Sequence, residues 1–164
     1  MSAQNKINLL FVDDEVKFLT SIASRLELQG FDVTTATNGN EAIDAAEKGL
    51  FDVAVLDYQM PGMDGAQVLK ILKERHDYIE IIMLTGHATV NSAVECTRLG
   101  AFQYLEKPYA FEKLVETIKD AYEARLKRKF ENNIKRFNEI QKLSIGSSPL
   151  GILKALASLD NEEK

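Results

Sequence analysis

The sequence predicts a doubly wound α/β domain, in which helices cover both faces of a five-stranded parallel sheet. Short apolar runs alternate with helical patterns from residue 7 to about residue 122. Two of these runs, at 7–12 and 52–56, are almost continuously apolar, which is typical of strands buried on both faces. Strands that alternate with helices are joined by right-handed crossovers and therefore lie parallel.

The elements follow one another in a regular order. Each strand is a short apolar run, and each helix is a stretch in which apolar residues recur three or four positions apart. Gly30, Gly49 and Gly100 directly follow helical stretches, at positions where C-terminal caps are expected. We predict strands at 7–12, 31–36, 52–56, 80–85 and 101–105, and helices at about 15–29, 39–48, 65–76, 89–99 and from 111 onward.

The last helical pattern continues beyond the predicted domain. Its early apolar residues can pack on the sheet, whereas the later ones, which are interspersed with lysine and arginine, have no core left to bury them. An amphipathic helix of this kind usually pairs with another helix, often its own copy. We therefore predict a domain at 5–125 and a helical extension at 126–164. The apolar stripe consists of Phe111, Leu114, Ile118, Tyr122, Leu126, Phe130, Ile134 and Phe137.

The composition limits the partners and the location of the protein. The net charge of −5 and the pI of about 5.1 argue against binding of nucleic acid or an anionic membrane by the whole chain. Cys96 is the only cysteine, so no internal disulfide can form, as is usual in a reducing compartment. No apolar run approaches the roughly 18 residues of a membrane span. We expect a soluble, cytoplasmic protein that contacts neither membrane nor nucleic acid.

Acidic side chains end two of the predicted strands. Asp13 and Asp14 follow the first strand, and Asp57 follows the third. Ligands of open α/β sheets bind outside the carboxyl ends of the strands, so neighbouring strands would bring the three carboxylates together. Such close carboxylates repel one another by about 1–4 kcal/mol per pair. A cation must offset this repulsion, and all-oxygen ligation suits Mg²⁺.

Two further strand ends complete the predicted site. Thr85 ends the fourth strand and is followed by Gly86, which leaves room for a ligand, and Lys107 follows the fifth strand. A carboxylate can act as a nucleophile, a metal ion and a lysine can hold the transferring oxygens, and a hydroxyl can bind the product. This combination of side chains predicts phosphoryl transfer.

Four motifs, in their order and spacing, resemble those of the response-regulator receiver domain, a CheY-like member of the flavodoxin-like folds. The resemblance covers about residues 5–125 and implies the strand order 2-1-3-4-5 and a role in bacterial two-component signalling. It implies that a histidine kinase donates a phosphoryl group to Asp57 with Mg²⁺, and that the domain catalyses only its own phosphorylation and dephosphorylation. The motifs are Val12-Asp13-Asp14-Glu15, Leu56-Asp57-Tyr58-Gln59-Met60-Pro61-Gly62-Met63-Asp64-Gly65, Leu84-Thr85-Gly86 and Tyr104-Leu105-Glu106-Lys107-Pro108.

The resemblance also implies a role for each acidic residue of the site. Asp13 and Asp14 would bind Mg²⁺, directly or through water, together with Asp57 and the backbone carbonyl of Gln59. Lys107 would pair with Asp57 before phosphorylation and with a phosphoryl oxygen afterwards.

Further residues would respond to phosphorylation. Thr85 would move to the phosphoryl group, Tyr104 would turn inward behind it, and Gly86 would contribute a backbone N–H. The peptide bond between Lys107 and Pro108 is expected to be cis. The implied partners are a cognate histidine kinase and, through the C-terminal helix, a downstream protein or a second copy of the chain.

Simpler interpretations remain open for several of these residues. Asp13 or Asp14 could cap the first helix, because aspartate is favoured at N-caps. Thr85 could cap the helix that follows it, and Tyr104 could be a static core aromatic.

Other functions are also compatible with parts of the pattern. A haloacid-dehalogenase-like phosphatase uses an aspartate nucleophile with Mg²⁺, but it needs a second acid two residues later, where this chain has Gln59. A flavodoxin-like cofactor site needs a phosphate-binding loop, whereas Asp13 and Asp14 would repel phosphate. A phosphorylation-independent interaction module is a third alternative. Finally, residues 145–150 resemble the junction between the receiver linker and the ATPase domain of NtrC-type activators.

Overall fold

The computed structural model describes residues 5–144, 153–154 and 157. Strands and helices alternate along this part of the chain, as predicted. The strands are β1 (Asn8–Val12), β2 (Asp32–Ala36), β3 (Val53–Asp57), β4 (Glu80–Thr85) and β5 (Gln103–Glu106). The helices are α1 (Val16–Leu28), α2 (Gly39–Lys48), α3 (Gly65–Arg75), α4 (Val90–Arg98) and α5 (Phe111–Ser144).

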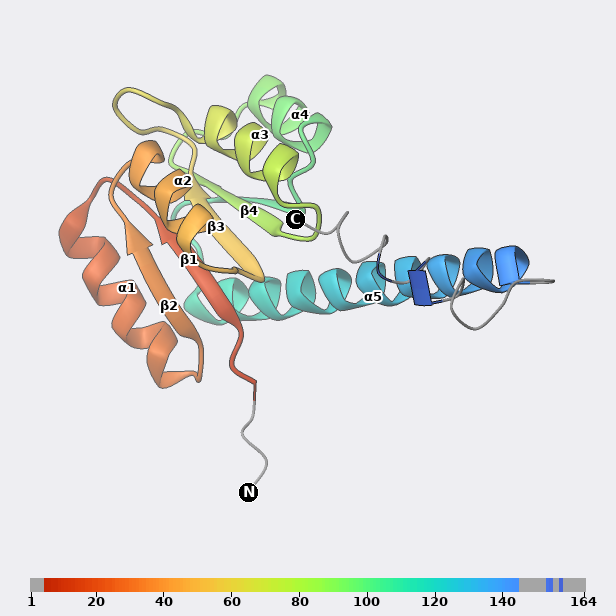
Figure 1. Cartoon of the computed structure of the whole chain (residues 1–164). Helices are drawn as coiled ribbons and strands as arrows, with labels where there is room; N and C mark the ends of the chain where they lie inside the picture. Colours follow the sequence, from red (N-terminus) through yellow and green to blue (C-terminus); the bar gives the residue numbers. More distant parts are fainter. Residues whose placement is uncertain (1–4, 145–152, 155–156, 158–164) are drawn as a thin grey trace. The chain divides into compact units, whose positions relative to one another are not determined.

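The strands form a parallel sheet in the order β2-β1-β3-β4-β5, which confirms the predicted fold class and strand order (Figure 1). In the centre of the sheet, Leu9 is paired with Val53 and Val12 with Leu56. The C-terminal ends of β1 and β3 therefore lie side by side. The residues that directly follow these two strands are brought to the same edge.

The sheet has a hydrophobic core on each face, because successive side chains of a strand point to opposite sides. In β1, Leu10 and Val12 belong to the core beneath α2, α3 and α4, whereas Leu9 and Phe11 belong to the core beneath α1 and α5. All four side chains are fully buried. Burial on both faces explains why the central strands are almost continuously apolar in sequence.

Side-chain caps define where three of the helices begin. Asn38, Asp64 and Thr89 are the N-caps of α2, α3 and α4, and each accepts a hydrogen bond from the backbone three residues later. Gln67 completes a capping box with Asp64. Helix α1 instead begins after Glu15, whose side chain makes no capping hydrogen bond. Hence neither Asp13 nor Asp14 is the N-cap of the first helix.

The structure corrects one local prediction and confirms the expected helix ends. The fifth strand begins at Gln103 rather than at 101, because the backbone N–H of Ala101 donates to Cys96 and completes the end of α4. Gly30 and Gly100 follow their helices with φ of 96° and 100°, in the left-handed region that favours glycine. Gly49 is the C-cap of α2, as predicted: its backbone N–H donates to the Ala45 carbonyl, and its φ of −143° is an extended conformation open to any residue.

The chain divides into two compact units, 1–125 and 126–164. The last residue of the first unit, Arg125, forms an ion pair with Asp52, which directly precedes β3, with 3.1 Å between Nε and Oδ1. Helix α5 is continuous over 34 residues and contributes to both units. Within the described ranges, no helix is both long enough and apolar enough to cross a membrane.

Candidate functional site

Three carboxylates meet at the C-terminal edge of the sheet. One oxygen from each of Asp13, Asp14 and Asp57 lies within 4.8 Å of the others. Asp13 is fully buried and Asp57 is 6% exposed, whereas Asp14 is open to solvent. Asp13 also accepts a hydrogen bond at 2.9 Å from the backbone N–H of Glu15, which orients its carboxylate. The parallel pairing of β1 with β3 produces this cluster.

Lys107 places a positive charge beside the buried acids. Its Nζ donates a hydrogen bond to Asp13 Oδ2 at 3.1 Å and lies 3.6 Å from Asp57 Oδ2. The predicted ion pair of Lys107 with Asp57 is present, and Lys107 in addition donates a hydrogen bond to Asp13. Burial favours the neutral amine, yet the hydrogen bond to Asp13 and the charges of Asp13 and Asp57 outweigh it and raise the pKa of Lys107.

The pKa of Asp57 is raised to about 6, and burial is the main cause. The negative charges of Asp13 and Asp14 raise it further, while Lys107 and the backbone N–H of Gln59 lower it. Asp57 is thus a carboxylate whose charge the surrounding protein only partly compensates. It would be ionised at pH 8 and able to act as a nucleophile.

Hydrogen bonds and close packing hold the backbone around Asp57. Gln59 donates its backbone N–H to Asp57 Oδ1 at 3.2 Å, and Tyr58 N–H donates to the Leu84 carbonyl at 2.7 Å. Gly65 approaches from α3 so closely that a Cβ atom there would overlap the Asp57 carbonyl oxygen and lie 2.8 Å from Tyr58 Cα. The Pro-Gly-Met-Asp-Gly segment of the second motif therefore returns the chain directly against the loop that follows Asp57.

Thr85 and Gly86 lie at the end of β4, next to β3. Thr85 is fully buried, and its Oγ1 accepts the backbone N–H of His87 at 3.2 Å. Thr89, not Thr85, is the N-cap of α4, so the capping interpretation of Thr85 was wrong. Gly86 is exposed and has open space where a side chain would lie. The cis peptide bond between Lys107 and Pro108 is confirmed.

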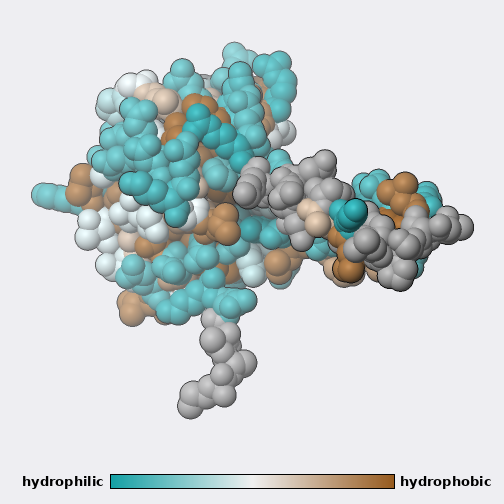
Figure 2. Space-filling model, in the orientation of Figure 1, coloured by the Kyte–Doolittle hydropathy of each residue, from teal (hydrophilic) through white to brown (hydrophobic). Residues whose placement is uncertain are grey.

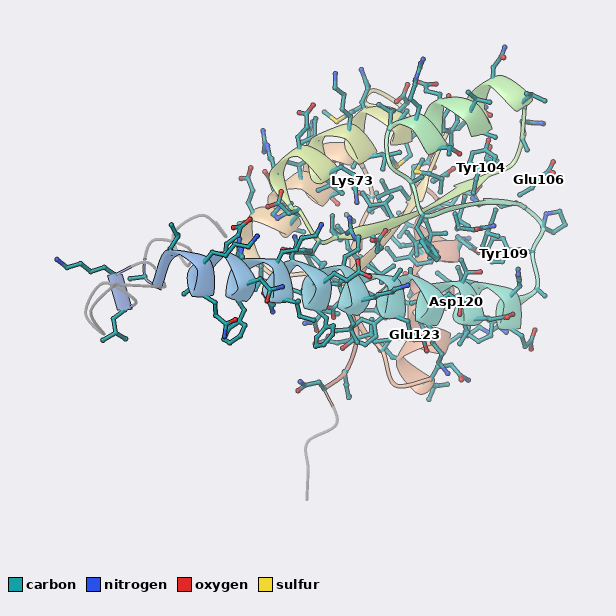
Figure 3. All side chains as sticks on the ribbon, turned by 90° about the vertical axis from the view of Figure 1, so that its right-hand side faces the viewer. Lys73, Tyr104, Glu106, Tyr109, Asp120 and Glu123 are labelled. Carbon is teal, nitrogen blue, oxygen red and sulfur yellow. The ribbon has the colours of Figure 1, made fainter. Side chains whose placement is uncertain are left out.

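Tyr104 is half-buried and turned toward α4 (Figure 3). Its hydroxyl is 2.7 Å from Ser92 Oγ, and Ser92 also completes a capping box with Thr89. On the other side of β5, Tyr109 packs into the core formed with α1 and α5. Sequence reasoning did not find Ser92; its only local signal is its position three residues after a threonine N-cap.

The donor set fits a small, hard cation. Among the residues that the structure describes, the group that could hold a metal ion consists of three carboxylates, without histidine or cysteine, and oxygen-only sites are typical of Mg²⁺. Three carboxylates face a single lysine, so the cluster retains an excess of negative charge. The backbone carbonyl of Gln59, predicted as a further ligand, belongs to the loop that follows Asp57.

The fold and the site together define a doubly wound α/β domain with an all-carboxylate cluster at the C-terminal edge of its sheet. The sequence matches the family described as "Response regulator receiver domain" over residues 9–119, and the chain belongs to this family. It is therefore a response-regulator receiver domain of a two-component system.

Individual relatives agree with this assignment. One relative, the "Putative response regulator NtrX-like" of Rickettsia bellii, is 33% identical in sequence to this chain. The match covers 94% of this chain and 32% of the relative. The transcriptional regulatory protein ZraR of Salmonella typhimurium is 36% identical over 72% of the chain and 27% of its own length. A CheY-like receiver domain from Methanospirillum hungatei superimposes with a TM-score of 0.73 at 29% identity, over 76% of this chain and 99% of that one.

The chain thus spans about a quarter to a third of the length of the curated relatives that it matches. The match to the NtrX-like relative includes most of the extension, which fits the predicted resemblance to the linker of NtrC-type activators. The residues that carried this resemblance, 145–150, lie outside the described part of the chain.

Proposed function

We propose that Asp57 accepts a phosphoryl group from the phosphohistidine of a cognate histidine kinase. An oxygen of the Asp57 carboxylate bonds to phosphorus while the phosphorus–nitrogen bond breaks, and the leaving imidazole keeps the electron pair and takes up a proton. The observation that supports the proposal is the buried Asp57 beside two further acids and Lys107, at the edge where such folds bind ligands.

We propose Asp13, Asp14, Asp57 and the Gln59 backbone carbonyl as the residues that hold Mg²⁺. When bound, the ion would supply positive charge next to the phosphoryl oxygens. Lys107 already contacts both buried acids, so a small movement of its ammonium group can bring it to a phosphoryl oxygen. Both charges act in a partly buried site, where electrostatic stabilisation exceeds that in water.

The switch is expected to follow from the new charge on Asp57. A phosphoryl group adds strong hydrogen-bond acceptors, to which the Thr85 hydroxyl and the backbone N–H of Gly86 would donate. Movement of Thr85 toward them leaves space behind it, which Tyr104 can fill when it leaves Ser92. The conformational equilibrium shifts tenfold for about every 1.4 kcal/mol by which the phosphoryl group favours the switched state.

The output is proposed to be protein interaction through the extension, with either a downstream protein or a second copy. Leu126, Phe130, Ile134 and Phe137 are between 45% and 65% exposed, and the described part of this unit carries apolar patches (Figure 2). Apolar side chains at helical spacing favour helix pairing. Sedimentation of the chain with and without 126–164 tests the dimer: a monomer in both cases, phosphorylated or not, would exclude it.

A haloacid-dehalogenase-like phosphatase is a weaker candidate. Gln59 is exposed and offers no carboxylate two residues after Asp57. Turnover of a phosphorylated small molecule beyond one equivalent would favour this candidate over the phosphoacceptor.

The proposal is tested by intact mass after incubation with Mg²⁺ and acetyl phosphate. The native chain should gain one phosphoryl group, whereas the Asp57→Asn variant and the native chain in EDTA should gain none. The exposed Asp64→Asn variant is the matched control and should react like the native chain. A folded, Mg²⁺-binding native chain that gains no mass would indicate a phosphorylation-independent interaction module.

A further inference from the structure

Helix α4 has little apolar anchoring. Its buried residues are Ser92 and Cys96, and only the second of these is apolar. Val90 and Val94 are 81% and 57% exposed, so they do not hold the helix to the sheet. Elements with few buried apolar contacts have low local stability. The position of α4 must therefore depend strongly on its polar contacts.

Two tyrosine hydroxyls from different segments provide such contacts. Tyr104, on β5, lies 2.7 Å from Ser92 Oγ, and Tyr58, in the loop after β3, donates to Glu95 Oε2 at 3.2 Å. Ser92 and Glu95 are three residues apart and hence neighbours on one face of α4. The hydrogen bond to Glu95 is charge-assisted, which makes it stronger than one between neutral groups.

The two tyrosines differ in how firmly they are held. The backbone of Tyr58 is fixed on both sides: its N–H donates to Leu84 at 2.7 Å, and its carbonyl accepts from Gly65 at 2.9 Å. Its ring packs against the core beneath α4. Tyr104 can leave its position when the space behind Thr85 opens. Tyr58 is thus the fixed anchor of α4 and Tyr104 the movable one.

The hydroxyl of Ser92 is shared between Tyr104 and the cap of α4. Ser92 Oγ lies within 2.7–3.1 Å of Tyr104 OH and of the backbone N–H, the backbone carbonyl and the Oγ1 of Thr89. A hydroxyl has one donor and two acceptor positions, so it cannot satisfy all four contacts at once. When Tyr104 leaves, Ser92 stays hydrogen-bonded to Thr89 but loses its contact with β5, so the first turn of α4 is held less firmly to the sheet.

We propose that Tyr58 is a positioning residue that fixes Glu95, and with it the centre of α4, relative to the phosphoacceptor loop, so that α4 pivots about Glu95 when Tyr104 releases Ser92. The pivoting depends on the proposed phosphorylation of Asp57. The anchoring of α4 by Tyr58 does not, because both hydrogen bonds belong to the unphosphorylated protein.

Amide hydrogen exchange of the unphosphorylated full chain tests the anchor. In Tyr58→Phe, the amides from Glu95 to Leu99 should exchange about tenfold faster, as expected for loss of a charged hydrogen bond. Glu95→Gln, which keeps a weaker acceptor, should show a smaller effect in the same direction. Tyr122→Phe removes a hydroxyl on α5 and should leave α4 unchanged.

The division of roles is tested by Tyr104→Phe and by the double variant. Tyr104→Phe should accelerate amide exchange in the first turn of α4 only. The double variant Tyr58→Phe/Tyr104→Phe should accelerate exchange throughout α4, by a factor larger than the product of the factors for the two single variants. Phosphorylation of the native chain should change the exchange of α4 in the same way as Tyr104→Phe does. Phosphorylation of the Tyr58→Phe variant should change it in the same way as the double substitution does.

Three results would overturn the proposal. If the amides of α4 exchange in Tyr58→Phe at the same rate as in the native chain, the Tyr58 hydroxyl does not anchor this helix. Equal acceleration in β1 and β3 would show a general loss of stability rather than release of α4. Additive effects in the double variant would show that the tyrosines act independently. If Asp57 accepts no phosphoryl group, only the phosphorylated comparison is lost and the anchor is still tested.

Discussion

Replacement of Asp57 by asparagine is expected to stabilise the receiver domain at pH 8 but hardly at pH 4. The pKa of Asp57 is raised from its ordinary value of 3.8 to about 6 in the folded chain, chiefly by burial and then by Asp13 and Asp14. Because the folded pKa is the higher one, the protonated acid favours folding. The stabilisation of the folded state by the protonated acid is complete below pH 3.8 and is lost as the pH rises through 6.

The size of the effect follows from the difference between the two pKa values. A difference of about two units, at 1.36 kcal/mol per unit, corresponds to about 3 kcal/mol of unfolding free energy above pH 7. Asparagine resembles the protonated acid in shape and removes the ionised form. Lys107 keeps its hydrogen bond to Asp13 in the variant, so the loss of the longer contact to Asp57 offsets little of the gain.

Urea unfolding at pH 4 and pH 8, in EDTA, measures this difference. The free energy of unfolding of Asp57→Asn should exceed that of the native chain by about 3 kcal/mol at pH 8 and by less than about 1 kcal/mol at pH 4. Asp44→Asn, on the exposed side of α2, changes the net charge equally and is the matched control. An Asp57→Asn variant that is less stable at pH 8, or equally stabilised at both pH values, would refute the electrostatic reasoning.

Three further predictions concern the metal site, Lys107 and the cap of α3. Mg²⁺ at 100 times its dissociation constant should stabilise the native chain by about 2.7 kcal/mol in urea unfolding, and Asp13→Asn should remove most of this effect; equal stabilisation of both chains would place the ion elsewhere. Lys107→Ala should lower stability by about 3 kcal/mol at pH 8 and by less at pH 4, because it leaves Asp13 and Asp57 without their cation; unfolding curves that shift equally at both pH values would contradict this. Asp64→Ala should lower stability by about 1 kcal/mol through loss of the α3 capping box, and an unchanged melting temperature would show that the cap contributes nothing.

Much of the fold was predictable because it follows from local patterns. Apolar runs at 7–12 and 52–56 predicted buried parallel strands, and the acids that follow them were expected at one edge, where Asp13, Asp14 and Asp57 meet. The strand order came from the resemblance to a known family rather than from periodicity. The start of β5 was misplaced because Ala101 and Phe102 are apolar but belong to the end of α4 and the following loop.

Side-chain contacts between distant segments were not predictable in the same way. The bonds of Tyr58 with Glu95 and of Tyr104 with Ser92 join residues 37 and 12 positions apart, and no periodicity records such pairs. The preference of Lys107 for Asp13 over Asp57 likewise depends on distances of 3.1 and 3.6 Å, which only the folded chain defines. Sequence reasoning identified the types of group at the site, and packing determined how they are paired.

The central claim is that Asp57 is the residue that carries the phosphoryl group. The native chain can be treated with Mg²⁺ and acetyl phosphate and then reduced with borohydride, which converts an aspartyl phosphate to homoserine. Peptide mapping should find homoserine at position 57 alone, and only when Mg²⁺ is present. Homoserine at another aspartate, such as Asp13 or Asp14, or a phosphoryl group on a different residue type would contradict the account.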